Sequence, residues 1–146
     1  MKKYCIYLSV LVLVALFGAA CEDEEVVEAE PLESSSVGGA ELETGYDFDE
    51  DELEIIDVQT TFEPNRDFYF MFSNNQPIGE DSVVVELIDT ADDQVLAEEN
   101  YDTEEETEKV YDKIWFSRPG RYKIVVHVGD EERAMQELII KEKEQN

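Results

Sequence analysis

The side chains that most often carry out catalysis are scarce in this chain. Among its 146 residues there is one histidine, His127, and there are two cysteines, Cys5 and Cys21. A Ser-His-Asp or Cys-His arrangement needs a nucleophile held beside a histidine, and nothing here resembles a nucleophile elbow. A zinc site of nitrogen and sulfur ligands needs more histidine and cysteine than this. We therefore expect a protein that is not an enzyme and holds no cofactor or metal, with His127 on the outer face of a strand.

Carboxylates are abundant, and one run of them has the spacing of a calcium site. Aspartates alternate at the start of the segment Asp47–Glu52, as the first ligands of an EF-hand loop do. That loop needs glycine at its sixth position and a bidentate glutamate at its twelfth, where this chain has Glu52 and Val58. We interpret the run as solvated charge, with weak divalent-cation binding as the alternative.

The strongest binding pattern combines aromatic rings with one cation. If Ile114 and Phe116 point from their strand into the core of the domain, Tyr111 and Trp115 lie on the opposite face of the strand with Lys113 between them. Exposed aromatic side chains on a flat sheet are typical of surfaces that bind glycans or proteins, because they offer a large rigid contact area. In the alternative interpretation, a shifted register or a covering loop makes Trp115 an ordinary packing residue.

The charge balance excludes one class of partner and predicts a tether. With 11 basic against 38 acidic residues, the formal net charge is −27, which would repel a phosphate backbone, so no nucleic-acid partner is expected. No basic residue occurs between Lys3 and Arg66. Residues 21–52 are therefore predicted to form a disordered acidic tether. An acidic surface adapted to a saline habitat would produce the same excess, so charge alone identifies no ligand.

The first twenty residues have the pattern of a secretory signal peptide. Lys2 and Lys3 precede an apolar run, Ile6–Phe17, and small residues then lead into Cys21. Because the run has only 12 residues, it is too short to span the hydrocarbon layer comfortably. We predict that residues 1–20 are removed, which leaves Cys21 as the only cysteine of the mature chain.

The stretch Gly18-Ala19-Ala20-Cys21 resembles the lipobox of bacterial lipoproteins, in which the cysteine carries the acyl chains that hold the protein in the membrane. Glu22, Asp23, Glu24 and Glu25 follow directly and are similar to the surface-export signal of Bacteroidota lipoproteins. These resemblances imply a lipid-anchored outer-membrane protein at the cell surface. Ordinary signal cleavage, an acidic run that simply opens a linker, and a location at the periplasmic face are the alternatives.

From Leu53 onwards, short apolar blocks separated by turn residues predict an all-β domain over residues 53–146. Seven short strands in this length are the size of a single immunoglobulin-like antiparallel β-sandwich. Alternation predicts that Phe68, Phe70 and Phe72 face the core. The predicted strands cover Glu54–Phe62, Asp67–Ser73, Ser82–Asp89, Gln94–Tyr101, Thr107–Phe116, Arg121–Val128 and Arg133–Lys141.

The end of this domain resembles polycystic-kidney-disease-type and other immunoglobulin-like extracellular modules. The resemblance rests on an aromatic residue, Phe116, followed by Pro119-Gly120 and Tyr122 and then by alternating apolar residues. It implies that Pro119 and Gly120 turn the chain into the penultimate strand and that Tyr122 packs as a structural corner. It specifies architecture and not activity.

Two classes of function follow from these patterns. In the first, the chain is a non-catalytic, lipid-anchored surface module that binds a glycan or an envelope protein partner. In the second, it is a structural or envelope-assembly lipoprotein that faces the periplasm and binds divalent cations weakly at most. The patterns do not specify the ligand or the oligomeric state.

Overall fold

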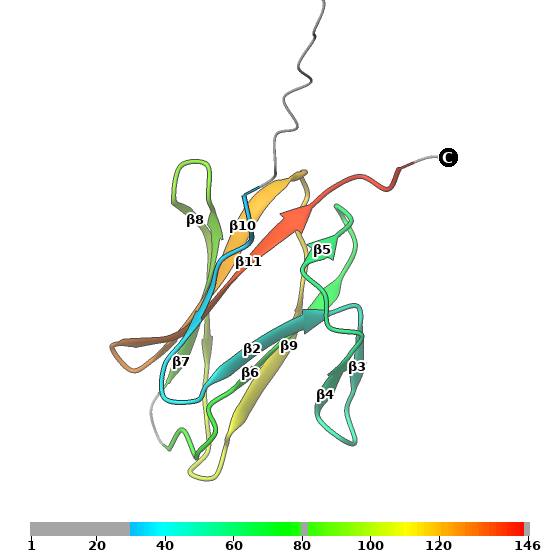
Figure 1. Ribbon diagram of the computed structural model, residues 1–146. Helices are drawn as coiled ribbons and strands as arrows, with labels where there is room; N and C mark the ends of the chain where they lie inside the picture. The colour runs from blue at the N-terminus through cyan, green and yellow to red at the C-terminus, as the bar shows by residue number, and fades with distance from the viewer. Residues whose placement is uncertain (1–29, 80–81, 145–146) are drawn as a thin grey trace, which may run out of the picture. The chain divides into compact units, whose positions relative to one another are not determined.

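The computed structural model describes residues 30–79 and 82–144, in which two mainly antiparallel sheets pack face to face (Figure 1). The larger sheet has the strand order β1-β11-β10-β7-β8, and β5 pairs in parallel with β11. Among the described residues there is no helix long and apolar enough to cross a membrane. The strands of this sheet are β1 (Ser34–Ser36), β5 (Thr61–Phe62), β7 (Val83–Asp89), β8 (Gln94–Tyr101), β10 (Gly120–Val128) and β11 (Glu131–Ile140).

The second sheet has three strands, in the order β2 (Glu41–Gly45), β6 (Phe68–Ser73) and β9 (Lys109–Ile114). A separate two-stranded hairpin, β3 (Asp47–Asp49) with β4 (Glu54–Ile56), contacts both β2 and β6. Figure 1 shows this hairpin beside the three-stranded sheet, on the side away from β7 and β8.

The core lies between the two sheets and follows the alternation of side chains along each strand. Phe68, Phe70 and Phe72 of β6 are fully buried, as their spacing predicted. From the larger sheet they meet Ile124 of β10 and Leu138 of β11, which are also fully buried. Burying a side chain of this size contributes about 1.5–3 kcal/mol to the stability of the fold. No cysteine occurs among the described residues, so no disulfide crosses the core that they form.

The predicted all-β, antiparallel sandwich is confirmed, and so are the six predicted strands from Asp67 onwards, to within two residues at each end. The predicted number of seven strands is wrong, because the described residues form eleven. The first predicted strand, Glu54–Phe62, is instead two short strands, β4 and β5. The chain leaves the extended conformation at Asp57, whose φ is +54°. The segment after it then bonds to β2 through Gln59 N–H and Thr44 O at 2.9 Å.

The prediction that residues 21–52 form a disordered tether is wrong for the part that the structure describes. β1, β2 and β3 all lie within that range, and the compact unit begins at Pro31 and not at residue 53. In β2, Leu42 and Thr44 point toward the core, while Glu41 and Glu43 point outward. The side chains therefore alternate as in any strand, although the acidic composition of the segment makes that alternation hard to recognise in the sequence. The predicted signal peptide, Cys21 and the acidic run Glu22–Glu25 lie outside the described residues.

Candidate functional site

The outer face of the three-stranded sheet carries the predicted binding residues. Because Phe68, Phe70 and Phe72 face the core, their neighbours Tyr69 and Met71 face outward. On β9, Tyr111 and Lys113 are the register partners of Met71 and Tyr69. These outward side chains therefore form one row across β6 and β9.

Phe48 of β3 packs on this row. Its ring centroid lies 4.4 Å from that of Tyr111 and 5.3 Å from that of Tyr69, and both pairs are stacked. The Lys113 ammonium lies 5.2 Å from the centre of the Tyr69 ring. The hairpin β3–β4 thus covers part of the face on which Tyr111 and Lys113 were expected to be open, although Tyr111 stays 40% exposed.

A glycine allows the hairpin to come this close to the sheet. A Cβ atom on Gly45, the last residue of β2, would lie 2.5 Å from Cγ2 of Ile55 and 3.1 Å from the carbonyl oxygen of Ile56. Both distances are shorter than ordinary van der Waals contacts. At its tip the hairpin is also held by Lys109, whose ammonium donates to Leu53 O at 2.9 Å.

Trp115 follows directly after β9 and is 57% exposed. Its predecessor Ile114 pairs with Phe68, which places Asp67 and Trp115 at the same end of the sheet. The loop that contains Trp115 is hydrogen-bonded to the loop between β5 and β6, because Asn65 N–H donates to Phe116 O at 2.8 Å. Trp115 makes no ring-stacking or cation–π contact with the described residues. The indole is therefore accessible at the open end of the row.

A hollow of about 490 Å³ lies beside this aromatic row. Its wall combines rings and aliphatic surface with two carboxylates and one ammonium, a mixture that can stack on a ligand and hydrogen-bond to it. The guanidinium of Arg66 covers the Tyr46 ring at 3.8 Å. The hollow is lined by Tyr46, Asp47, Phe48, Ile56, Asp67, Tyr69 and Lys113.

The ammonium of Lys113 is held in its charged form by its surroundings. A hydrogen bond with Tyr69 raises the pKa of Lys113 above its ordinary value, and the carboxylates of Asp67 and Glu50 act in the same direction. Since the ammonium is exposed, it can donate hydrogen bonds to a bound hydroxyl or carboxylate group.

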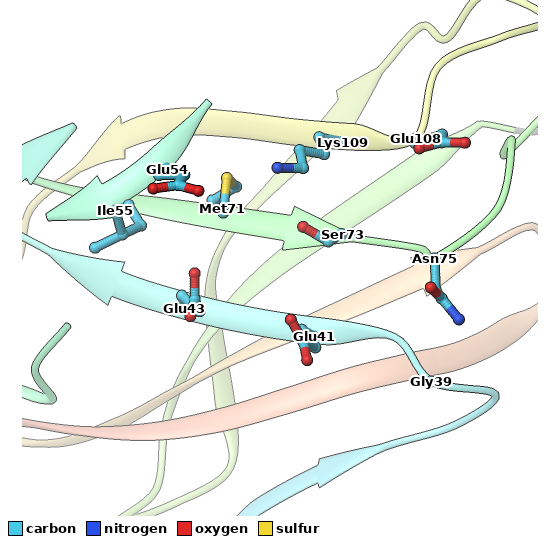
Figure 2. A pocket seen from close by; sticks show the side chains of 10 residues that line it. All are labelled: Gly39, Glu41, Glu43, Glu54, Ile55, Met71, Ser73, Asn75, Glu108 and Lys109. Atoms are coloured by element: carbon cyan, nitrogen blue, oxygen red, sulfur yellow. The ribbon is translucent and has the colours of Figure 1, made fainter. Parts of the chain in front are cut away.

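An acidic groove of about 670 Å³ lies on the other side of the hairpin (Figure 2). Glu41 and Glu43 of β2 face Glu54 of the hairpin across it, and Lys109 reaches in from β9. Within the described part of the chain, no three His, Cys, Asp or Glu side chains are grouped closely enough to hold a metal ion. In the acidic run Asp47–Glu52, Asp49 Oδ1 accepts hydrogen bonds from the backbone N–H groups of Asp51 and Glu52 at 2.9 and 3.0 Å. Asp49 therefore stabilises the turn of the hairpin.

The corner residues and the histidine lie away from this face. Tyr122 is buried, stacks on Phe116 at 4.2 Å, and donates its hydroxyl hydrogen to Arg118 O at 2.9 Å. That hydrogen bond to the backbone a few residues upstream is the geometry of a tyrosine corner. Pro119, in the loop before β10, and Gly120, the first residue of β10, are both exposed. His127 is half-buried on β10, with Nε2 3.0 Å from Glu86 Oε2.

Sequence reasoning missed the contribution of the hairpin to this site. Tyr46, Phe48 and Ile56 all come from a stretch with a strongly acidic composition. The signal that could have found them is the pairing of two aromatic residues two positions apart with the apolar pair Ile55-Ile56, with turn residues between. That is the pattern of a short hairpin.

The fold and the site define an all-β protein built as an antiparallel sandwich with an aromatic-lined hollow at one end. No family model matches the chain, and no curated protein matches it. Among solved structures, the chain is similar to a DUF3244 family protein with an immunoglobulin-like β-sandwich fold from Bacteroides vulgatus. The two chains are 14% identical, the match covers 76% of this chain and 100% of the other, and the TM-score is 0.40.

Proposed function

We propose that this chain is a non-catalytic, lipid-anchored module of the cell envelope that binds a glycan at the Trp115 end of sheet β2-β6-β9. The observation that carries the binding proposal is the exposed indole of Trp115 at the same end of the sheet as the hollow lined by Phe48 and Tyr69. A volume of about 490 Å³ lies in the range of small-ligand sites. The nearby carboxylates and the Lys113 ammonium supply the polar contacts that orient a sugar.

The anchoring part of the proposal rests on the sequence. The signal pattern ending at Cys21 supports acylation of that cysteine, and the run Glu22–Glu25 supports export to the cell surface. Two acyl chains or more are enough for stable attachment to a membrane.

Binding is tested by screening the full chain against a glycan array and repeating the positive interactions with Trp115→Ala. Loss of one stacked ring is expected to weaken binding about tenfold, with an unchanged urea midpoint because the indole is mostly exposed. Val37→Ala, at a side chain that is 47% exposed and remote from the hollow along the chain, is the matched control. If Trp115→Ala unfolds the domain, Trp115 is a packing residue and the site is wrong. If no glycan binds while an envelope protein does, the ligand class is wrong.

Location is tested by proteinase digestion of intact cells together with mass analysis of the N-terminal peptide. Digestion on unbroken cells with an acylated Cys21 is the expected result. Protection until the outer membrane is broken would move the protein to the periplasmic face, and an unmodified Cys21 would remove the anchor.

A further inference from the structure

β8 is the last strand of the larger sheet and is open along its outer side. It pairs with β7 from Gln94 to Tyr101, with one irregularity at Leu96, which has no register partner on β7. Within residues 30–79 and 82–144, no other strand pairs with it, and Figure 1 shows β8 at the outer margin of the sheet. An edge strand of eight residues presents a row of unpaired N–H and C=O groups that can pair with another extended chain.

The side chains of β8 are apolar near the beginning of the strand and acidic toward its end. Val95 and Leu96 are 46% and 48% exposed at its beginning. Glu98 and Glu99 follow, and residues 91–108 contain nine acidic residues and no lysine or arginine. An extended partner that matches this edge therefore needs an apolar part beside Val95 and Leu96 and cations beside the glutamates.

One of these glutamates lacks a counter-charge in the described part of the chain. Glu98 lies directly opposite Glu86 of β7, and like charges in that position destabilise a sheet. Glu86 is hydrogen-bonded on its other side by His127, whereas Glu98 has no ion pair or hydrogen bond to a described side chain. A cation on a strand added beyond β8 would lie beside Glu98 and relieve the repulsion.

We propose that β8 binds an extended basic segment of a partner protein by strand addition, with its Lys or Arg side chains beside Glu98 and its apolar side chains beside Val95 and Leu96. Main-chain hydrogen bonds supply affinity in this mode, and the alternate side chains supply specificity. A second copy of the chain is a poor occupant, because it would bring another acidic edge and another net charge of −27. The acidic run Glu22–Glu25 of the same chain is a poor occupant for the same reason.

The test uses two short labelled peptides that each have valines in one half, the other half being rich in lysine in one peptide and in glutamate in the other. The lysine peptide is expected to bind the full chain, to bind more weakly as salt is raised, and to slow hydrogen exchange of the β8 amides. Glu98→Lys is expected to weaken this binding about tenfold and to permit binding of the glutamate peptide. Glu132→Lys, the same charge change at an exposed position of β11, is the matched control.

Three results would overturn the proposal. Equal effects of Glu98→Lys and Glu132→Lys would mean that the peptide responds to net charge alone. Slowed exchange in other strands but not in β8 would place the peptide elsewhere. Sedimentation of the free chain as a dimer that Glu98→Lys alters would make a second copy the occupant. Trp115→Ala should leave peptide binding unchanged, which separates this edge from the proposed glycan site.

Discussion

Arg121 of β10 and Glu137 of β11 form an ion pair that also holds the beginning of the domain. Arg121 Nη2 lies 2.6 Å and Nε 3.0 Å from the same oxygen, Glu137 Oε2. That oxygen accepts the backbone N–H of Glu33 at 2.9 Å, and the guanidinium donates to Pro31 O at 2.7 Å. The pair therefore ties the residues that precede β1 to the two strands that end the chain.

Replacing this arginine should destabilise the domain more than replacing its neighbour on the same strand. Arg121→Ala leaves a largely buried carboxylate without its partner and is expected to lower the free energy of unfolding by about 2 kcal/mol. Lys123→Ala removes an ion pair to Asp93, whose side chain is 79% exposed, and should cost less than about 0.5 kcal/mol. Urea denaturation of the two variants measures the difference, and equal losses would show that the Arg121 pair stabilises the domain no more than the exposed Lys123 pair does.

The same carboxylate makes part of the stability depend on pH. Burial raises the pKa of Glu137, but the Glu33 N–H and the Arg121 guanidinium outweigh burial and hold it below its ordinary value. Since the folded pKa is the lower one, the stabilisation is complete above the ordinary glutamate pKa and is lost as pH falls through the lowered value. Protonation of the many other carboxylates also relieves repulsion, so only a comparison isolates this group.

That comparison is the free energy of unfolding of wild type minus that of Glu137→Gln, measured from neutral pH downward. The difference should be largest above the ordinary glutamate pKa and should shrink below it. A difference that stays constant across the acid range would contradict the role assigned to the Glu137 charge.

The strands of the core could be predicted from sequence because apolar residues alternate without interruption in them. The two-residue spacing of Phe68, Phe70 and Phe72 predicts both a β-strand and the face of that strand that is buried. β1 is three serines, all exposed, and exists because it pairs with β11, which is a contact that local composition does not report. The candidate site was predicted in the same partial way. Alternation along the strand singled out Trp115, which is 57% exposed, but it did not find Phe48, whose neighbours in the sequence are acidic.

The tyrosine corner should respond to loss of one hydroxyl. Tyr122→Phe removes the hydrogen bond to Arg118 O and keeps the ring stacked on Phe116, so it is expected to cost about 1 kcal/mol. Burial, helped by the charge of Asp89, raises the pKa of Tyr122 above its ordinary value of 10.0. This contribution to stability is therefore complete below the ordinary pKa and is lost as pH rises through the raised value.

Urea denaturation at neutral and at high pH measures both effects for Tyr122. The wild type should lose stability as the pH rises past 10.0, and part of that loss should be absent in Tyr122→Phe. If the two proteins lose the same stability over that range, ionisation of Tyr122 does not contribute to it.

The stacking of Phe48 on Tyr69 and Tyr111 is expected to hold the hairpin β3–β4 against the sheet. Phe48→Ala removes two stacked contacts from a half-buried ring and is expected to cost about 2 kcal/mol. Because the hairpin lies outside the main core, the loss should appear as local opening, with faster hydrogen exchange across residues 47–56 and little change in β6 or β10. Ile56→Ala, which shortens a side chain that is 45% exposed on the same hairpin, is the matched control. Faster exchange through all strands would show that the hairpin and the sandwich unfold as one unit, and the hollow would then depend on the stability of the whole domain.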